Sequence, residues 1–155
     1  MRDVLRLQED CYVEIEPESW ASLEAKILAS PSTCMVAEAA DGVAGYLISV
    51  PIRYPDLPAL NDPAFRQAPD ADTLYIHDLA VAEAGRGTGA GRAMVRSAMK
   101  AAKARGLGRA CLVAIQGSVP YWERLGFEVI GAPPDRVAAK LASYGAAAQL
   151  MHASF

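Results

Sequence analysis

The stretch AVAEAGRGTGAGRAM, residues 80–94, joins an apolar run to a helical pattern and holds four glycines and two arginines between them. Glycine suits positions where the backbone turns tightly or where another group approaches closely. A strand, a glycine turn and a helix in this order bring free backbone N–H groups and the positive end of a helix dipole to one point, which favours a phosphate. We therefore expect an anion site at Gly87–Gly91, with charge-assisted hydrogen bonds from Arg86 and Arg92. A turn that only packs the helix on the strand is the alternative, but such a turn seldom needs alternating glycines.

Composition indicates one folded domain over residues 1–155. The chain has 155 residues, of which 52% are hydrophobic and 21% charged, as in globular proteins rather than disordered ones. A formal net charge of -3 argues against nucleic acid or an anionic membrane as the partner. No apolar stretch approaches the roughly 18 residues that a membrane span needs.

The cysteines and the first residues bear on metal binding and on location. Cys11, Cys34 and Cys111 are odd in number and far apart, and with two histidines they form no ligand cluster, so we expect no metal. The start, MRDVLRLQED, lacks the apolar centre of a signal peptide. We expect reduced thiols in a cytoplasmic protein.

Hydrophobic spacing predicts a mixed α/β (α+β) domain. Asp41-Gly42 marks a hairpin between two strands, and the five prolines from Pro51 to Pro69 indicate a long loop, often a lid or a binding loop. Ser118 is suited to cap a short helix that Gly126 closes. The expected helices are 4–11, 20–29, 89–105, 118–126 and a loose 136–143, and the expected strands are 33–50 as a hairpin, 74–81, 109–115, 127–131 and 147–155.

Two common phosphate motifs fit poorly. No Lys-Ser or Lys-Thr follows the glycines, which excludes the nucleoside-triphosphate loop. GRGTGA (residues 85–90) satisfies the dinucleotide fingerprint G-x-G-x-x-A, but the next strand ends LVAIQG and lacks the acidic residue which that fingerprint requires. A nicotinamide-dependent oxidoreductase is therefore disfavoured.

Arg86–Gly91 also reads R-x-x-G-x-G, and here the sequence resembles the GNAT superfamily of acetyl-CoA-dependent N-acetyltransferases. HDLAV (77–81), RGTGAG (86–91) and YWERLGF (121–127) carry the resemblance, which extends from about Cys34 to Ile130, with SYGAAAQLM near the end also similar. It implies one domain with a mixed, mostly antiparallel sheet, flanked by helices, whose splayed strands hold the cofactor. Relatives usually have a strand before the first helix, where this chain starts almost inside that helix, so the resemblance does not determine the edge of the sheet.

The resemblance implies a residue-by-residue cofactor site for acetyl-CoA, the co-substrate. Backbone groups of three strand residues would bind the pantetheine arm, and those of the glycine turn would bind the pyrophosphate with the two arginines alongside. Ser118 to Trp122 would flank the thioester. The implied cofactor residues are Leu79, Ala80, Val81, Arg86, Gly87, Thr88, Gly89, Ala90, Gly91, Arg92, Ser118 and Trp122.

Direct transfer of acetyl to an amine needs a base, because an amine with a pKa near 10 is protonated at pH 7. His77 is our candidate, since some members of the superfamily have a histidine at this position; a hydrogen-bonded histidine in the sheet is an equal alternative. Strand alternation puts Tyr75 on the same face, toward the acceptor, and Asp78 on the other, where it could tie the strand to a loop. Relatives often have a tyrosine acid where this chain has Trp122, so Tyr121, one residue earlier, is our candidate acid, with water as the alternative.

Further expectations concern an alternative function, the acceptor, the oligomeric state and Cys111. A non-catalytic acyl-CoA sensor is the alternative function, which the Trp122 departure keeps open. In relatives, the segment with Glu14, Glu16 and Glu18 and the long loop border the acceptor cleft. Carboxylates there would suit a cationic amine acceptor, although acidic loops are more often only solvated, and the resemblance also allows a homodimer. Cys111 is the alternative nucleophile, but no histidine near it in the sequence is placed to activate it, and a small buried residue is its more common role.

Overall fold

The structure, a computed structural model, describes residues 2–155 and contains one six-stranded sheet flanked by helices. The strands are β1 (Met35–Ala39), β2 (Gly42–Ile52), β3 (Thr73–Val81), β4 (Arg109–Ala114), β5 (Glu128–Val129) and β6 (Gln149–Ser154). Their order in the sheet is β1-β2-β3-β4-β6-β5, and every neighbouring pair is antiparallel except β3 and β4. The mixed, mostly antiparallel sheet expected from the sequence is confirmed.

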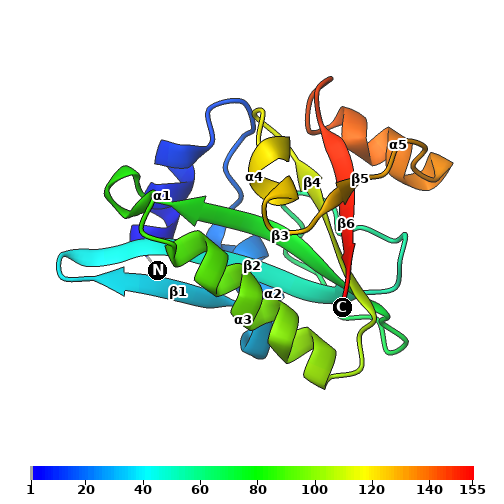
Figure 1. The fold of residues 1–155 in the computed structure, drawn as a ribbon, viewed down its shortest axis with the longest axis horizontal. Coiled ribbons are helices and arrows are strands. Elements are labelled where there is room, and N and C mark those ends of the chain that lie inside the picture. Colours follow the sequence, from blue (N-terminus) through cyan, green and yellow to red (C-terminus); the bar gives the residue numbers. More distant parts are fainter. Residues whose placement is uncertain (1) are drawn as a thin grey trace.

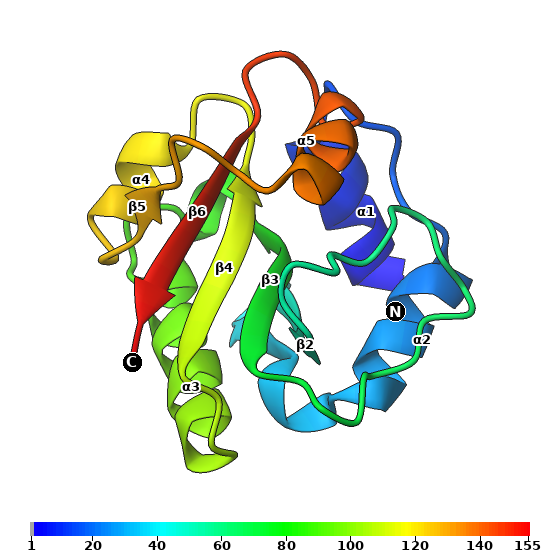
Figure 2. The same ribbon diagram turned by 90° about the vertical axis from the view of Figure 1, so that its right-hand side faces the viewer.

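Helices cover both faces of the sheet (Figures 1 and 2). The helices α3 (Ala90–Ala104) and α4 (Val119–Glu123) pack on one face, around a core that includes Met94, Val95 and Trp122. The other face carries α1 (Arg2–Cys11), α2 (Trp20–Ala29) and α5 (Asp135–Ala142). Within residues 2–155, no helix combines the length and the apolar character that a membrane crossing requires.

Local sequence explains where these helices begin. Ser19 caps α2, its hydroxyl accepting a hydrogen bond from the Ser22 N–H, and Gly89 precedes α3 in the left-handed conformation. Ser118 occupies the cap position of α4 as expected, but its side chain makes no capping bond. Ser118 instead starts the helix through its carbonyl, which accepts hydrogen bonds from the backbone N–H groups of Tyr121 and Trp122.

The long connection from β2 to β3 is a packed loop. The strand β2 continues through Pro51 to Ile52, so the loop starts later than the prolines suggested. Leu57 and Phe65 are buried in the core below it, and Asp72 accepts hydrogen bonds from Arg53 (2.7 Å) and from the Tyr54 N–H (3.0 Å). The loop is anchored at both ends.

Strands β3 and β4 separate part-way along their length, and this separation positions the site. Their parallel pairing extends only from Thr73 and Arg109 to Ile76 and Leu112. Beyond Ile76, β3 stays paired with β2 while β4 stays paired with β6, and Figure 1 shows the two strands diverging. The last five residues of β3 therefore present an edge of the strand with no neighbour in the sheet.

Candidate active site

A cleft of about 840 Å³ occupies the space between the diverging strands. It runs from the N-terminus of α3, past the edge of β3, to the segment between α1 and α2. Of the site residues expected from the sequence, it brings together His77, Leu79, Ala80, Val81, Arg86, Gly87, Gly89, Gly91, Arg92, Ser118, Tyr121 and Trp122. Thr88, Ala90 and Tyr75 do not line it.

The four positions of the turn that hold glycine require it for different physical reasons. Gly87 and Gly89 adopt φ angles of 78° and 87°, a left-handed conformation that other residues rarely adopt. A Cβ on Gly91 would lie 2.6 Å from the Tyr121 hydroxyl, and one on Gly85 would lie 3.2 Å from the Ala44 carbonyl. The turn therefore needs glycine twice for its backbone and twice for close packing.

The other residues of the turn divide between the cleft and the turn itself. Arg86 and Arg92 are exposed and line the cleft, and the Arg86 Nε donates to the Val81 carbonyl at 3.4 Å. The Thr88 hydroxyl donates to the Gly85 carbonyl at 2.6 Å, which closes the turn. Ala90 begins α3.

The free edge of β3 meets side chains from the end of α1. The Leu79 carbonyl accepts a hydrogen bond from the Tyr12 hydroxyl at 3.0 Å, and the Val81 carbonyl accepts one from the Cys11 thiol at 3.6 Å. Peptide groups of successive strand residues point to opposite edges. The peptide groups of Ala80, between these two, are therefore directed toward β2, where Ala80 is paired with Tyr46.

A β-bulge lies at His77. The register between β2 and β3 passes from Ile48 opposite Asp78 to Ser49 opposite Ile76, which leaves His77 as an extra residue on β3. A bulge interrupts the alternation of side chains. Tyr75 and His77 share a face as expected, with ring centroids 5.8 Å apart. The prediction that Asp78 lies on the opposite face is wrong, because the bulge turns its side chain toward α1 as well.

Asp78 ties β3 to its surroundings, which confirms its structural role. Its two oxygens accept hydrogen bonds from the hydroxyls of Tyr12 and Tyr46, the latter at 2.6 Å. Burial raises the pKa of Asp78, an effect that the two tyrosine hydrogen bonds oppose. Burial and the Asp78 charge raise the pKa values of both tyrosines.

His77 is hydrogen-bonded to Glu18, which precedes α2. The His77 side chain is 1% exposed, and its Nε2 contacts Glu18 Oε1. Burial alone would raise the pKa of Glu18, but the hydrogen bond and charge of His77, with Ser22 and Lys26, lower it from 4.5 to about 2. An ionised carboxylate only accepts hydrogen bonds, so Nε2 donates. In residues 2–155, His77 Nδ1 alone is a buried side-chain nitrogen or oxygen without a hydrogen-bond partner.

Sequence reasoning placed Glu18 in an acidic segment at the acceptor end and missed its partners. Glu18, Ser22 and Lys26 recur at four-residue spacing, which places them on one face of a helix. The signal in the sequence was this spacing, which puts a serine and a lysine on the same face of a helix as the glutamate. Tyr12 and Tyr144, which also line the cleft, had no such signal.

Aromatic side chains close the α4 side of the cleft. Tyr121 and Trp122 contact each other edge to face, with ring centroids 5.2 Å apart, and Trp122 contacts Phe127 at 5.5 Å. Trp122 is both a cleft residue and a core residue. Burial raises the pKa of Tyr121, which the nearby Arg124 opposes. The Tyr121 hydroxyl therefore keeps its proton at neutral pH.

Tyr75 lies behind the cleft and contacts a residue that lines it. Its hydroxyl is 3.2 Å from that of Tyr144, which follows α5. Burial raises the pKa of Tyr144 to about 12. The prediction that Tyr75 itself contacts the acceptor stays untested.

Cys111 is outside the cleft. His152 on β6 is directly opposite it in the sheet, so a histidine is near after all. Burial nevertheless raises the pKa of the Cys111 thiol to about 12, which leaves no thiolate at neutral pH.

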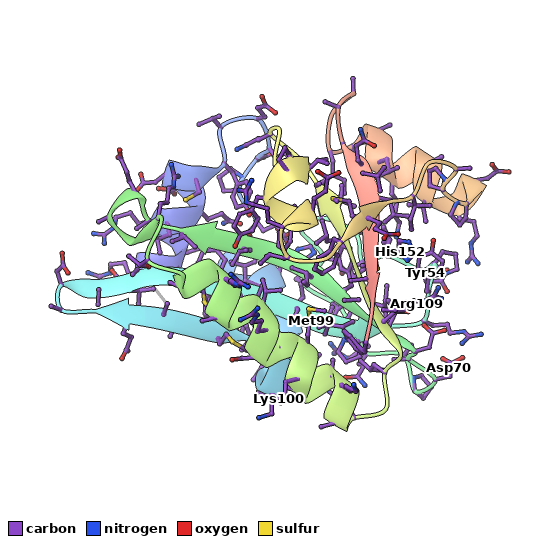
Figure 3. The ribbon with its side chains drawn as sticks, viewed as in Figure 1. Tyr54, Asp70, Met99, Lys100, Arg109 and His152 are labelled. Carbon is purple, nitrogen blue, oxygen red and sulfur yellow. The ribbon has the colours of Figure 1, made fainter. Side chains whose placement is uncertain are left out.

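Nearby, Arg109 stacks over the Tyr54 ring at 4.3 Å (Figure 3), a contact that packs this end of the sheet. Among residues 2–155, no three potential metal ligands gather in one place.

Comparison with solved structures shows the fold. The loading GNATL domain of CurA from Lyngbya majuscula superposes with a TM-score of 0.75 at 13% identity, covering 99% of this chain and 92% of that one. The GphF GNAT-like decarboxylase in complex with isobutyryl-CoA gives 0.73 at 17%, with 99% and 93% covered. Ard1 from Thermoplasma volcanium gives 0.70 at 16%, with 99% and 89% covered.

Comparison of the sequence with protein families is more specific. A search of curated proteins finds no match. The model of the Acetyltransferase (GNAT) family matches residues 1–127, which includes the glycine turn, all of β3 and the aromatic residues of α4. With this match and the fold it accompanies, the chain belongs to the Acetyltransferase (GNAT) family.

Proposed function

We propose that this protein transfers an acetyl group from acetyl-CoA directly to an amine, in a ternary complex, with His77 as the general base. One observation carries the proposal: a single cleft contains the N-terminus of α3, the free edge of β3 and a buried histidine–carboxylate pair. These three parts match the three needs of the reaction, which are a phosphate site, a site for an extended arm and a proton acceptor.

The cofactor would follow the cleft from the glycine turn to His77. Backbone N–H groups of Gly87–Gly91 would bind the pyrophosphate, helped by the helix dipole and by Arg86 and Arg92. The arm would extend along β3 beside Leu79 and Val81, whose carbonyls face the cleft, whereas Ala80 is directed to β2. The complex of the GNAT-like decarboxylase with isobutyryl-CoA supports an acyl-CoA ligand for this fold.

His77 would remove the proton of the amine. Its Nε2 is occupied by Glu18, so the neutral ring offers Nδ1, which is buried and has no hydrogen-bond partner among residues 2–155. The proton would reach Nδ1 from the amine directly or through a water molecule, and the free amine would then attack the thioester carbonyl. The C–S bond of the tetrahedral intermediate breaks as the coenzyme A thiolate leaves.

Tyr121 would protonate this thiolate. Its hydroxyl lies at the first turn of α3, against Gly91, and retains its proton at neutral pH. Trp122 has no acidic hydroxyl and would form the wall of the cleft beside it. Ser118, at the start of α4, lines the same wall.

The test is a screen of amines with the purified protein and acetyl-CoA. Release of free thiol is followed with a colorimetric reagent, and the acetylated product is identified by mass spectrometry. We expect thiol release that depends on one class of amine, with one acetylamine formed per thiol. Tight binding of acetyl-CoA without transfer to any small amine or peptide N-terminus would favour a sensor of acyl-CoA instead.

A further inference from the structure

A lysine side chain is completely buried beneath the candidate base. Lys26 on α2 is 0% exposed, and its ammonium donates to Glu18 Oε2 at 2.9 Å and to the Ser22 hydroxyl at 2.7 Å. Buried lysines need a partner of opposite charge, since an isolated buried ammonium is strongly unfavourable. Lys26, Glu18 and His77 thus form one buried, hydrogen-bonded chain from α2 to β3.

Glu18 is held at its backbone as well as at its carboxylate. The Gln8 side-chain amide, 3% exposed, donates to the Glu18 carbonyl at 2.9 Å and accepts from the Glu18 N–H at 3.0 Å. Oε2 accepts from Ser22 and Lys26, so Oε1 alone is directed to His77. The position of the carboxylate is therefore fixed independently of the histidine.

We propose that Lys26 is a positioning residue for the base: by neutralising Glu18 it lowers the affinity of His77 for a proton and leaves Nδ1 free to accept one. The proposal rests on the proposed function of His77. A lone carboxylate would orient the ring but would also stabilise its protonated form. With the Lys26 ammonium on its other oxygen, the carboxylate still orients the ring, but it stabilises the protonated form of the ring less.

The surroundings of Nδ1 favour the neutral ring too. A protonated ring would place an N–H at Nδ1, an atom that is buried and has no hydrogen-bond acceptor among residues 2–155. A buried donor without a partner is costly, whereas a neutral ring presents only a lone pair there. The charge of Lys26 and the lack of a hydrogen-bond partner at Nδ1 thus both favour the neutral ring.

The other groups near His77 do not replace Lys26. Asp78, the second nearby carboxylate, is satisfied by two tyrosine hydroxyls and makes no hydrogen bond to the ring. Tyr75 and Tyr144 carry no charge at neutral pH, because burial raises both pKa values. Two titratable groups contact the ring, Glu18 before α2 and Tyr75 on β3. The other charged and titratable groups around it are the chain neighbour Asp78 and the hydrogen-bond partners of these three residues, which are Lys26 on α2, Tyr46 on β2, Tyr12 after α1 and Tyr144 after α5.

A purely structural ion pair is the competing explanation. Buried ion pairs can often be replaced by apolar residues of similar size without loss of stability. Stability alone therefore does not distinguish the two explanations, and the test must read the protonation of the ring.

The experiment is an NMR titration of the imidazole nitrogens in the ligand-free protein, which needs no acceptor. The chain has two histidines, so His77→Gln assigns the signals and His152 serves as an internal reference. We compare the wild type with Lys26→Met, with Lys26→Met combined with Glu18→Gln, and with Lys100→Met. Lys100 is exposed on α3, on the opposite face of the sheet (Figure 3), and its replacement changes the net charge equally.

The wild-type ring should be neutral at pH 7, with its proton on Nε2. Lys26→Met should raise the midpoint of His77 protonation by about 1–3 pH units, the usual effect of an uncompensated carboxylate nearby. The double variant should return the midpoint to the wild-type value or below, and Lys100→Met should leave it unchanged. His152 should titrate alike in all four proteins.

An unchanged midpoint in folded Lys26→Met, or a shift that persists in the double variant, would overturn the proposal. Should Lys26→Met not fold, the wild type still decides: a ring that is charged at pH 7, or protonated on Nδ1 when neutral, contradicts it. These outcomes are independent of activity. A shifted midpoint with no loss of transfer in His77→Gln would show that Lys26 controls the protonation of the ring, but it would remove His77 from the reaction and with it the role of Lys26 in positioning a base.

Discussion

Gly91 and Tyr121 contact each other so closely that each restricts the other. The Tyr121 hydroxyl is 2.6 Å from the position of a Cβ on Gly91, closer than real Cβ contacts, while the ring carbon that bears it is at 3.7 Å. The phenol thus packs directly on the first turn of α3. A glycine that reads as part of a phosphate motif is therefore also required by a side chain 30 residues later.

Gly91→Ala should destabilise the protein, because the added methyl group forces the phenol to move. We expect a loss of about 1–3 kcal/mol, as for other overpacked sites, measured by urea unfolding. Combining it with Tyr121→Phe should recover most of the loss, since the atom in conflict is then absent. Gly131→Ala, where a Cβ meets open space, is the control. Equal losses for Gly91→Ala with and without the tyrosine hydroxyl would disprove the contact.

At the scale of elements, α3 supplies the candidate phosphate site at one end only. Gly89 precedes its first residue with φ 87°, and Gly106 follows its last turn with φ 82°. At both positions, no atom lies within 4 Å of the place that a Cβ would take. The two glycines are thus conformationally alike, but only the first is next to the cleft. The helix between them is about 22 Å long, from 15 residues at 1.5 Å each.

Gly89→Glu should abolish binding of acetyl-CoA, whereas Gly106→Glu should not. Both variants place the same charge and the same backbone strain on α3, so both should lower the melting temperature. Only the first puts a carboxylate where the pyrophosphate would bind. Calorimetry should show an affinity at least tenfold weaker for Gly89→Glu and within twofold of wild type for Gly106→Glu. Equal affinities in the two folded variants would place the phosphates elsewhere.

The contact of Glu18 with His77 joins the segment before α2 to β3, and its strength should depend on pH. The pKa of Glu18 is lowered in the folded protein from 4.5 to about 2. A lowered pKa means that the contribution of this carboxylate to stability is complete above pH 4.5 and disappears as the pH falls toward 2.

Glu18→Gln should therefore be less stable than the wild type by about 3–5 kcal/mol at pH 7, the usual loss when one partner of a buried pair is removed. The difference should shrink steadily between pH 4.5 and 2, because the wild-type carboxylate becomes protonated there. Urea unfolding at pH 7, 5, 4 and 3 measures it. Glu24→Gln, an exposed change on α2, should show a small difference at every pH. A Glu18→Gln deficit that is constant with pH would contradict the ion pair.

At the scale of the whole molecule, the sequence predicted what depends on local pattern. The hairpin at Asp41-Gly42, the limits of α2 between Ser19 and Ser30, and the glycine turn before α3 all follow from residues close together in the chain. The family resemblance then implied a mixed, mostly antiparallel sheet with splayed strands, which local patterns do not determine; the order of the strands was not predicted.

What the sequence could not predict depends on contacts between distant residues. Simple alternation placed Asp78 on the wrong face, because the bulge at His77 arises from its register with β2, about 30 residues earlier. Glu18 reaches His77 only because α2 packs across the sheet, over a separation of 59 residues. Pro51 read as the end of a strand, yet β2 continues past it.

The most direct test of the proposed function is the pH dependence of kcat/KM in wild type, His77→Gln and His152→Gln, with an acceptor found by the amine screen. If His77 is the base, wild-type kcat/KM rises with pH as the imidazole loses its proton. His77→Gln should lose roughly 10²–10⁴-fold, the usual size of a general-base contribution, and its remaining rise should follow the ionisation of the amine alone. Acetyl-CoA affinity should stay within twofold, and His152→Gln should match the wild type. A His77→Gln variant with a near-normal rate and an unchanged pH profile would contradict the account.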